Sequence, residues 1–241
     1  FYFSGANATS EPNLVDSCFF LIGEDDGIDH NGAILEVKNT WIEGFANEGI
    51  AASNENSVYV YNTLFKDNEQ GVEAGYGFPT VTVDHCVMIG NEYGLRFGDW
   101  YDWGCDGTIT CTNSIMVDND DNVHNFDFAT NGPIANAINL TYSIPTDAEY
   151  DMNTGNVVGT PNFTFNYQLE AGSAGVGAAS DGSNIGLVRP IISNVSNVEV
   201  ESGTLETFTV YSRDGKLICR GELPSQLESI QTSLNNGIYV I

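Results

Sequence analysis

Three side chains that could act together in acid–base chemistry occupy the same position of an internal repeat. Glu73, Arg96 and His124 each come directly after a Gly or Asn and an aliphatic residue. Stacked on successive repeats, they would form a line of an acid, a fixed cation and a titratable imidazole, which could bind and process an acidic or neutral sugar chain. The alternative is an ordinary surface ion pair between Glu73 and Arg96, worth at most about 1 kcal/mol, beside an unrelated histidine.

A loop rich in aromatic residues begins shortly after Arg96. Residues 98–107 carry Trp100, Tyr101 and Trp103 within four positions. Flat apolar rings with polar edges can stack on sugar faces, and Arg96 could orient a carboxylate or sulfate. We therefore expect a ligand groove, where one exists, to pass Arg96 with these rings as its wall. The loop could equally fold back as a lid over the apolar surface of the repeat.

Two tyrosines form a second and weaker candidate for a sugar platform. Tyr59 and Tyr61 occupy alternate positions of a predicted strand, so their side chains point to the same side. Lys38 falls beside them when the repeats are aligned. Together these residues could present two rings and a cation to a saccharide.

Five aspartates cluster at one turn position of the repeat and could bind calcium. They are Asp25, Asp26, Asp118, Asp120 and Asp121. Calcium takes six to eight oxygen ligands, which these carboxylates and the turn carbonyls could supply. The spacing of an EF-hand is absent, and the alternative is that these acids are solvated surface residues that aid solubility.

These candidates depend on a repeat that can be followed as far as Ser143. Its frame position holds aliphatic residues or cysteine: Val15, Val37, Val60, Val83, Cys111 and Leu140. Successive frame residues are 22, 23, 23, 28 and 29 positions apart. A period in this range indicates a solenoid, in which each unit buries its apolar face against the next. Alternating β-branched segments such as Val58–Val60 and Val81–Val83 indicate strands.

Residue types at equivalent positions predict inward columns and turn ladders. Three positions after the frame residue comes a small side chain in every repeat: Cys18, Thr40, Thr63, Cys86, Ser114 and Ser143. One predicted turn ladder consists of Asn68, Asn91 and Asn119, and another of Asn39, Asn62, His85 and Asn113. Asparagine tolerates left-handed backbone, and its side chain bonds to nearby backbone groups. We therefore interpret His85 as a substitute for a ladder asparagine.

Short strands, Asn/Gly turns and a period of about 22 residues resemble the right-handed parallel β-helix family. The resemblance implies an all-β solenoid through about residue 165, with coils about 4.8 Å apart and the frame residues stacked inward. Pectate lyases and polygalacturonases of this fold carry acid, Lys, Arg or His motifs, but neither Gly-His-Gly nor Arg-Ile-Lys occurs here. Because fold alone does not establish catalysis, the enzyme interpretation has less support than a binding one.

The composition is strongly acidic. The chain of 241 residues has 33 acids and 7 bases, and its formal net charge is −26. This charge argues against nucleic acid or an anionic membrane as a partner, and no stretch is apolar enough to span a membrane. Cys105 and Cys111 could pair across a loop, but no zinc-type CxxC spacing occurs. Because the chain opens within strand-like sequence at Phe1–Phe3, we expect it to be a mature or trimmed fragment whose earlier coils are missing.

A segment rich in Gly and Ser follows the repeat. Residues 161–190 resemble the segment that closes many secreted bacterial β-helices, and we expect them to cover the last coil. Arg189-Pro190 marks the expected boundary between a β-helix at 1–190 and a small β-sandwich-like module at 191–241. The predicted strands of this module are Val195–Val200, Thr207–Ser212, Lys216–Cys219 and Ile238–Ile241. Asp214-Gly215 is a hairpin signal between two of them.

The C-terminal residues resemble the sorting domain of proteins exported by the type IX secretion system of Bacteroidetes. The resemblance rests on Tyr211, Asp214, Gly215, Lys216, Leu234, Gly237, Ile238 and Tyr239. It implies recognition by the outer-membrane translocon and its shuttle barrel, export through the periplasm and outer membrane, and a location outside the cell or on its surface. The chain ends where such domains have a further strand, so we expect the module to be incomplete.

Two hypotheses for the β-helix follow. One is a passenger that binds glycans or acts as an adhesin. The other is a polysaccharide lyase or glycoside hydrolase that acts on acidic polysaccharide, with Glu73, Arg96 and His124 as candidate catalytic residues. A groove that holds these three at contact distance would favour the enzyme, whereas a flat acidic surface would favour the binding protein.

Overall fold

The computed structural model describes residues 1–5, 11–191, 207–211 and 217–222. The chain divides into two compact units, Phe1–Ile191 and Ile192–Ile241. The division falls one residue after Pro190. Among the described residues there is no long apolar helix of the kind that spans a bilayer.

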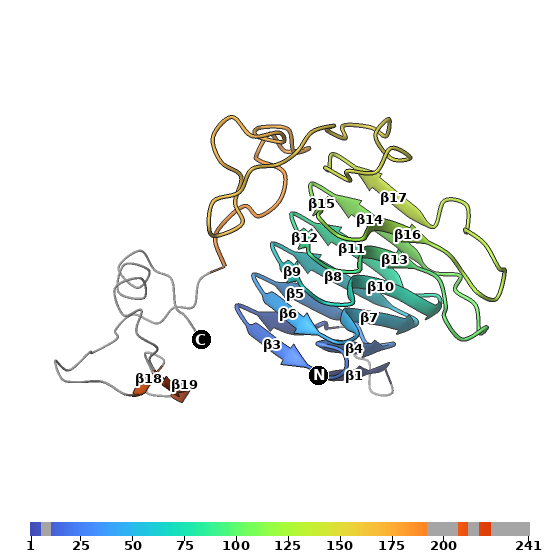
Figure 1. Cartoon of the computed structure of the whole chain (residues 1–241). Coiled ribbons are helices and arrows are strands. Elements are labelled where there is room, and N and C mark those ends of the chain that lie inside the picture. The colour runs from blue at the N-terminus through green and yellow to red at the C-terminus, as the bar shows by residue number, and fades with distance from the viewer. Residues whose placement is uncertain (6–10, 192–206, 212–216, 223–241) are drawn as a thin grey trace. The chain divides into compact units, whose positions relative to one another are not determined.

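The larger unit is an all-β solenoid built from three parallel sheets (Figure 1). Sheet A contains β1 (Tyr2–Ser4), β4 (Ile28–Asn31), β7 (Glu48–Asn54), β10 (Gln70–Gly77), β13 (Tyr93–Phe97) and β16 (Asp121–Asn125). Sheet B contains β2 (Asn13–Asp16), β5 (Leu35–Lys38), β8 (Ser57–Tyr61), β11 (Thr80–Asp84), β14 (Thr108–Thr112) and β17 (Ile138–Thr141). Sheet C contains β3 (Phe19–Gly23), β6 (Trp41–Phe45), β9 (Leu64–Lys66), β12 (Val87–Ile89) and β15 (Ile115–Val117). Each coil therefore passes once through every sheet, and the predicted parallel β-solenoid is confirmed.

The predicted register is confirmed at every step of the frame column. Val15 pairs with Val37, and each later frame residue pairs with the next as far as Leu140. All of these side chains are buried in one continuous core. Because strand side chains alternate between faces, a slip of one residue would have turned this whole column outward. The apolar frame position therefore fixes the register of the solenoid.

The column of small side chains closes the turn between sheets B and C. Each hydroxyl or thiol donates to the backbone carbonyl two residues earlier, as from Thr40 to Lys38 at 2.8 Å and from Ser114 to Thr112 at 2.8 Å. From Thr40 onward these side chains are buried. A small residue with one donor fits this space and satisfies a carbonyl at the turn. The thiols of Cys105 and Cys111 are free, so the suggested disulfide between them is absent.

The ladder of Asn68, Asn91 and Asn119 is confirmed. The Oδ1 of Asn91 accepts from both the backbone N–H and the side-chain amide of Asn68, each at 3.0 Å. Asn119 receives the same pair of bonds from Asn91, at 2.9 and 2.8 Å. Each side chain also donates to a carbonyl of the preceding coil, as Asn91 does to Phe65 at 3.3 Å. Three amides thus satisfy turn groups that the strands leave unpaired.

The second ladder has left-handed backbone, as its residue types predict. The φ angles are 51° at Asn39, 46° at Asn62, 52° at His85 and 54° at Asn113. His85 therefore occupies the conformation of a ladder asparagine. Its Nδ1 lies 3.1 Å from the carbonyl oxygen of Gly186, a residue of the segment that follows the solenoid.

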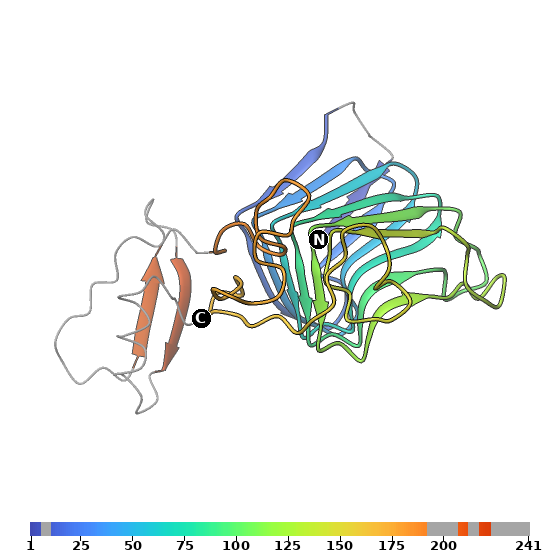
Figure 2. The ribbon, with the colours of Figure 1, turned by 90° about the horizontal axis from the view of Figure 1, so that it is seen from above.

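That segment extends well beyond the last coil, whereas the sequence predicted only that it covers the last coil. Residues 161–191 run back along the outside of sheet C (Figures 1 and 2). They cover an outward apolar column formed by Leu64, Val87, Ile115 and Ile144, with which they share a second hydrophobic cluster. We call residues 161–191 the closing segment.

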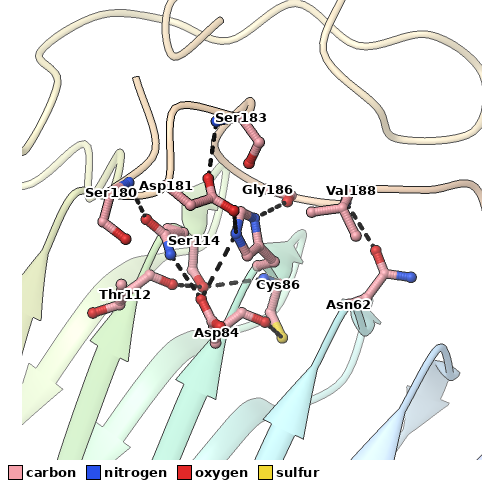
Figure 3. A network of polar contacts seen from close by, with 12 residues as sticks. Asn62, Asp84, Cys86, Thr112, Ser114, Ser180, Asp181, Ser183, Gly186 and Val188 are labelled. Atoms are coloured by element: carbon pink, nitrogen blue, oxygen red, sulfur yellow. Dashed lines mark hydrogen bonds and ion pairs between the residues drawn. The ribbon is translucent and has the colours of Figure 1, made fainter. Parts of the chain in front are cut away.

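Ladder side chains hold the closing segment in place (Figure 3). The Oδ1 of Asn62 accepts from the backbone N–H of Val188 at 2.9 Å. Asn113 accepts from the N–H of Gly186 at 2.7 Å through its carbonyl. Farther along, Arg189 Nε donates to Asn39 Oδ1 at 2.9 Å. The ladder therefore has a second role, because it binds a segment that lies far away in sequence, up to 150 positions in the case of Asn39 and Arg189.

The described part of the smaller unit is a two-stranded antiparallel sheet. It consists of β18 (Thr207–Tyr211) and β19 (Leu217–Glu222). These strands fall where two strands of the C-terminal module are predicted. The predicted strands Val195–Val200 and Ile238–Ile241 lie outside the described residues. So do the hairpin signal and the proposed sorting residues other than Tyr211.

Candidate functional site

Glu73, Arg96 and His124 lie side by side on the outer face of sheet A. Glu73 of β10 pairs with Arg96 of β13, which pairs with His124 of β16. Their neighbours Val72 and Leu95 point into the core, so these side chains must leave the opposite face. The repeat therefore brings the three candidate catalytic residues together on successive coils.

Arg96 is enclosed, contrary to the expectation that it reaches a ligand. Its side chain is 0% exposed and forms an ion pair with Glu73, which is also buried. The guanidinium carbon lies 4.3 Å from the centroid of the Trp100 ring. Its Nε and Nη2 have no hydrogen-bond partner, and the ring offers them a weak acceptor face. Trp100 thus covers the Arg96 guanidinium, whereas the alternative expectation was a lid over the apolar surface of the repeat.

The Trp100 ring belongs to a closed circuit of five rings. They belong to Tyr93, Trp100, Phe128, Phe126 and His124, and neighbouring centroids are 4.6–6.4 Å apart. The imidazole of His124 also lies 2.8 Å from Asp121, through Nδ1 and Oδ2. His124 is therefore a member of an aromatic cluster with its own carboxylate partner. This arrangement leaves it poorly placed to exchange a proton with Glu73.

A second line of polar residues lies beside the first and was missed at the sequence level. Gln70 donates to the carboxyl of Glu48, and the N–H of Glu48 lies 3.4 Å from an oxygen of Asp26. Burial raises the pKa of Glu48 to about 10, and a shared proton with Asp26 adds to this shift. Burial likewise raises the pKa of Glu73, although the charge of Arg96 opposes the change. The missed signal was an acid or amide directly before the Gly-aliphatic pair of several repeats.

The rest of the aromatic loop is exposed and yet firmly held. Tyr101 is 70% exposed and Trp103 is 68% exposed. The carboxylate of Asp99, which is buried, accepts from the N–H groups of Tyr101 at 3.0 Å, of Trp103, and of Gly104 at 2.9 Å. One buried carboxylate thus fixes the backbone that carries both exposed rings.

Tyr76, from the end of β10, extends this surface. Its ring meets Trp103 at 5.1 Å, and Trp103 meets Tyr101 at 5.5 Å. The amide of Asn54 donates to the Tyr76 hydroxyl at 3.1 Å. We call Tyr76, Tyr101 and Trp103 the aromatic platform. It offers ring surface together with neutral hydrogen-bonding groups, which is the chemistry that sugar hydroxyls and C–H faces match.

The second predicted platform is formed on sheet B. Tyr59 and Tyr61 stack with centroids 6.4 Å apart and planes inclined by 13°, and the Lys38 ammonium lies 5.9 Å from the Tyr59 ring. Lys38 is also paired with Glu36, and Tyr61 packs against His85. Both tyrosines are only partly exposed, so they offer less ring surface than the aromatic platform does.

The five aspartates proposed for calcium do not meet. Asp26 contacts Glu48 of the next coil, whereas Asp121 lies four coils beyond Asp26 along the same sheet. At about 4.8 Å per coil, Asp25 and Asp26 are too far from Asp118, Asp120 and Asp121 to share one ion. Within the described ranges no three His, Cys, Asp or Glu side chains are grouped so that they could hold a metal.

Fold and site together define a parallel β-solenoid protein with an aromatic surface on one sheet. No protein-family model matches the chain, and no curated protein is similar to it.

Proposed function

We propose that this solenoid is a glycan-binding or adhesin-like module, and that the aromatic platform is its binding surface. The observation that carries this proposal is the combination of exposure and fixed geometry at Tyr101 and Trp103. Large apolar rings that face solvent reduce solubility, and monomeric proteins rarely retain them in clusters without a partner. Because Asp99 already fixes the loop backbone, a ligand would bind without the entropic cost of ordering it.

The enclosed Glu73–Arg96 pair supports binding over catalysis. A catalytic acid or cation must touch the substrate, and Arg96 has no exposed surface. Its charge is opposed by Glu73 and its face is covered by Trp100. We therefore assign this pair a structural role beneath the loop.

A polysaccharide lyase or glycoside hydrolase remains the second candidate function, because one observation favours it. The raised pKa of Glu48 keeps this carboxyl protonated at neutral pH, as a general acid requires. Catalysis would need the aromatic loop to move away from Glu73 and Arg96. Release of reducing ends or of unsaturated sugars from acidic polysaccharides, lost in Glu48→Gln and Glu73→Gln, would support this function over simple binding.

Binding is tested with immobilised polysaccharides and the Trp103→Ala variant. We expect the wild type to bind at least one neutral polysaccharide and the variant to lose about tenfold or more in affinity, because stacked rings supply much of the contact energy. Phe165→Ala is the matched control, since Phe165 is 57% exposed and lies on the closing segment. Equal binding by Trp103→Ala and the wild type would remove the platform from consideration.

We further propose that residues 191–241 are a sorting domain of the type IX secretion system, which would place the protein outside a cell of Bacteroidetes or on its outer surface. The resemblance of the sequence from Tyr211 to Tyr239 supports this, and the antiparallel pair of β18 and β19 is compatible with it. The partners would be the outer-membrane translocon and its shuttle barrel.

Deletion of residues 192–241 from the complete gene product tests export. We expect the truncated protein to accumulate in the periplasm, and residues 191–241 fused to a periplasmic reporter to direct its secretion. Normal secretion of the truncated protein would contradict the sorting role.

A further inference from the structure

We infer that the aromatic platform selects glycans by charge, taking neutral sugars and rejecting acidic ones. This inference rests on the proposed binding function and names the class of ligand for the same surface. It reverses the sequence-level expectation that Arg96 orients a carboxylate or sulfate.

The first observation is that no described basic side chain is free beside the platform. On the larger unit the bases are Lys38, Lys66, Arg96 and Arg189. Lys38 and Lys66 lie on sheets B and C and are paired with carboxylates. Arg189 bonds to the second ladder. Arg96 alone lies near the aromatic loop, and it is buried and neutralised.

The second observation is that the loop itself carries exposed carboxylates. Asp102 stands between Tyr101 and Trp103 in sequence, and Asp106 follows Trp103 by three residues; both aspartates are exposed. The N–H of Asp106 bonds to the carbonyl of Gly77 at 2.6 Å, next to Tyr76. The loop that carries two rings of the aromatic platform therefore also carries two negative charges.

Coulomb repulsion then decides which sugars can stack. Two like charges about 4 Å apart in water repel each other by about 1 kcal/mol, and each 1.4 kcal/mol is a factor of about ten in affinity. With two loop carboxylates, and a protein of formal net charge −26, an acidic sugar loses roughly tenfold relative to a neutral one at low salt. The neutral groups of Asn54 and Tyr76 carry no such penalty toward hydroxyls.

The test compares each polysaccharide with its own oxidised form. The probes are soluble β-glucan, mannan and galactan, before and after conversion of their primary hydroxyls to carboxylates. We expect the wild type to bind at least one unmodified probe and to bind its oxidised form about tenfold more weakly. Salt at about 0.5 M, which shortens the screening length to a few ångströms, should reduce this difference.

The Asp102→Asn/Asp106→Asn variant should bind the oxidised probe about as well as the unmodified one. Asparagine suits position 102, where φ is 61°. The control is Asp118→Asn/Asp120→Asn, which changes the net charge equally at exposed positions on another turn and should leave the discrimination in place.

Each outcome separates the two proposals. Stronger binding of oxidised probes by the wild type would overturn charge selection while leaving glycan binding intact. Equal loss of discrimination in the control variant would overturn the role of the loop carboxylates. Binding of neither form would overturn the glycan-binding function, and charge selection would fall with it.

Discussion

Two segments cover the outside of the solenoid, and they do so in opposite ways. The closing segment buries apolar side chains, including Ile185 and Leu187, and bonds to ladder residues on several coils. The aromatic loop also bonds to neighbouring coils, as from Gly98 to Ala74 and from Asp106 to Gly77, but it leaves Tyr101 and Trp103 in solvent. Both segments are held by the scaffold, and in the aromatic loop the buried carboxylate of Asp99 also fixes the backbone that carries the two exposed rings.

This difference indicates that the closing segment contributes mainly to the stability of the fold, whereas the aromatic loop contributes exposed ring surface. Buried apolar area and satisfied polar groups stabilise the fold, and the closing segment has both. In the aromatic loop Cys105 joins the main core and Trp100 covers Arg96, whereas Tyr101 and Trp103 remain exposed. The exposed rings of Tyr101 and Trp103 bury less surface, and under the proposed function they are the surface available to a ligand.

The largest expected effect comes from breaking the buried pair beneath the loop. Arg96→Leu leaves Glu73 buried without its counter-ion, and we expect a loss of about 3–5 kcal/mol in the free energy of unfolding. Because burial already raises the pKa of Glu73, the loss should shrink at pH 4, where the carboxyl is protonated in the folded state and mostly protonated in the unfolded one. Denaturant unfolding at pH 4 and pH 8 measures both values.

The matched variant is Glu73→Gln/Arg96→Leu, which removes both charges. It should recover part of the stability that Arg96→Leu loses, because no uncompensated buried charge remains. If Arg96→Leu alone were as stable as the wild type, the loop would not depend on this pair.

A smaller loss is expected when the closing segment is weakened. Leu187 is 3% exposed within the second hydrophobic cluster, and Leu187→Ala should cost about 2–4 kcal/mol. Trp103→Ala in the aromatic loop should change stability by less than about 0.5 kcal/mol. Similar losses for the two variants in chemical denaturation would contradict the comparison between the segments.

Asn91→Ala tests the ladder that neither segment covers. The variant removes bonds to Asn68, Asn119 and Phe65, and we expect a loss of about 1–3 kcal/mol because buried backbone groups lose their partner. The measurement is the melting temperature, with Asn184→Ala as an exposed control. An unchanged melting temperature would show that the ladder does not stabilise the turn.

The last prediction concerns the direction of a pH dependence. The pKa of Glu48 is raised to about 10 in the folded protein, against about 4.3 for an unperturbed glutamate. A raised folded pKa gives stability that is complete below the unfolded value and is lost as pH rises through the folded one. Glu48→Gln should therefore gain stability relative to the wild type between pH 5 and pH 9. A constant difference in melting temperature across this range would contradict the shift.

The sequence predicted the solenoid and its register because both depend on neighbours one repeat away. The frame column and the Asn91 ladder follow from residue type alone, and His85 was recognised by its place among asparagines. The closing segment was harder to predict, since its sequence has no periodicity and its partners, such as Asn39 for Arg189, lie as much as 150 positions away.

The site was predicted only in part, for a physical reason. The register correctly placed Glu73 beside Arg96, because strand pairing is periodic. Burial of Arg96 depends on how residues 98–107 fold over it, and a loop of that composition has no period from which to read its path. The exposed position of Trp103 depends on the carboxylate of Asp99, and the partly exposed position of Trp100 depends on the guanidinium of Arg96.

The length of the closing segment is also matched to the number of coils in the solenoid. Gly186, Val188 and Arg189 meet ladder residues of different coils, so their spacing along the chain matches a fixed number of coils. Duplication of one coil between Asn62 and His85 would increase the distance between these two ladder residues by about 4.8 Å. An extended chain spans that distance with one or two residues. Evolution can therefore lengthen this protein by a whole coil only if the closing segment gains residues at the same time.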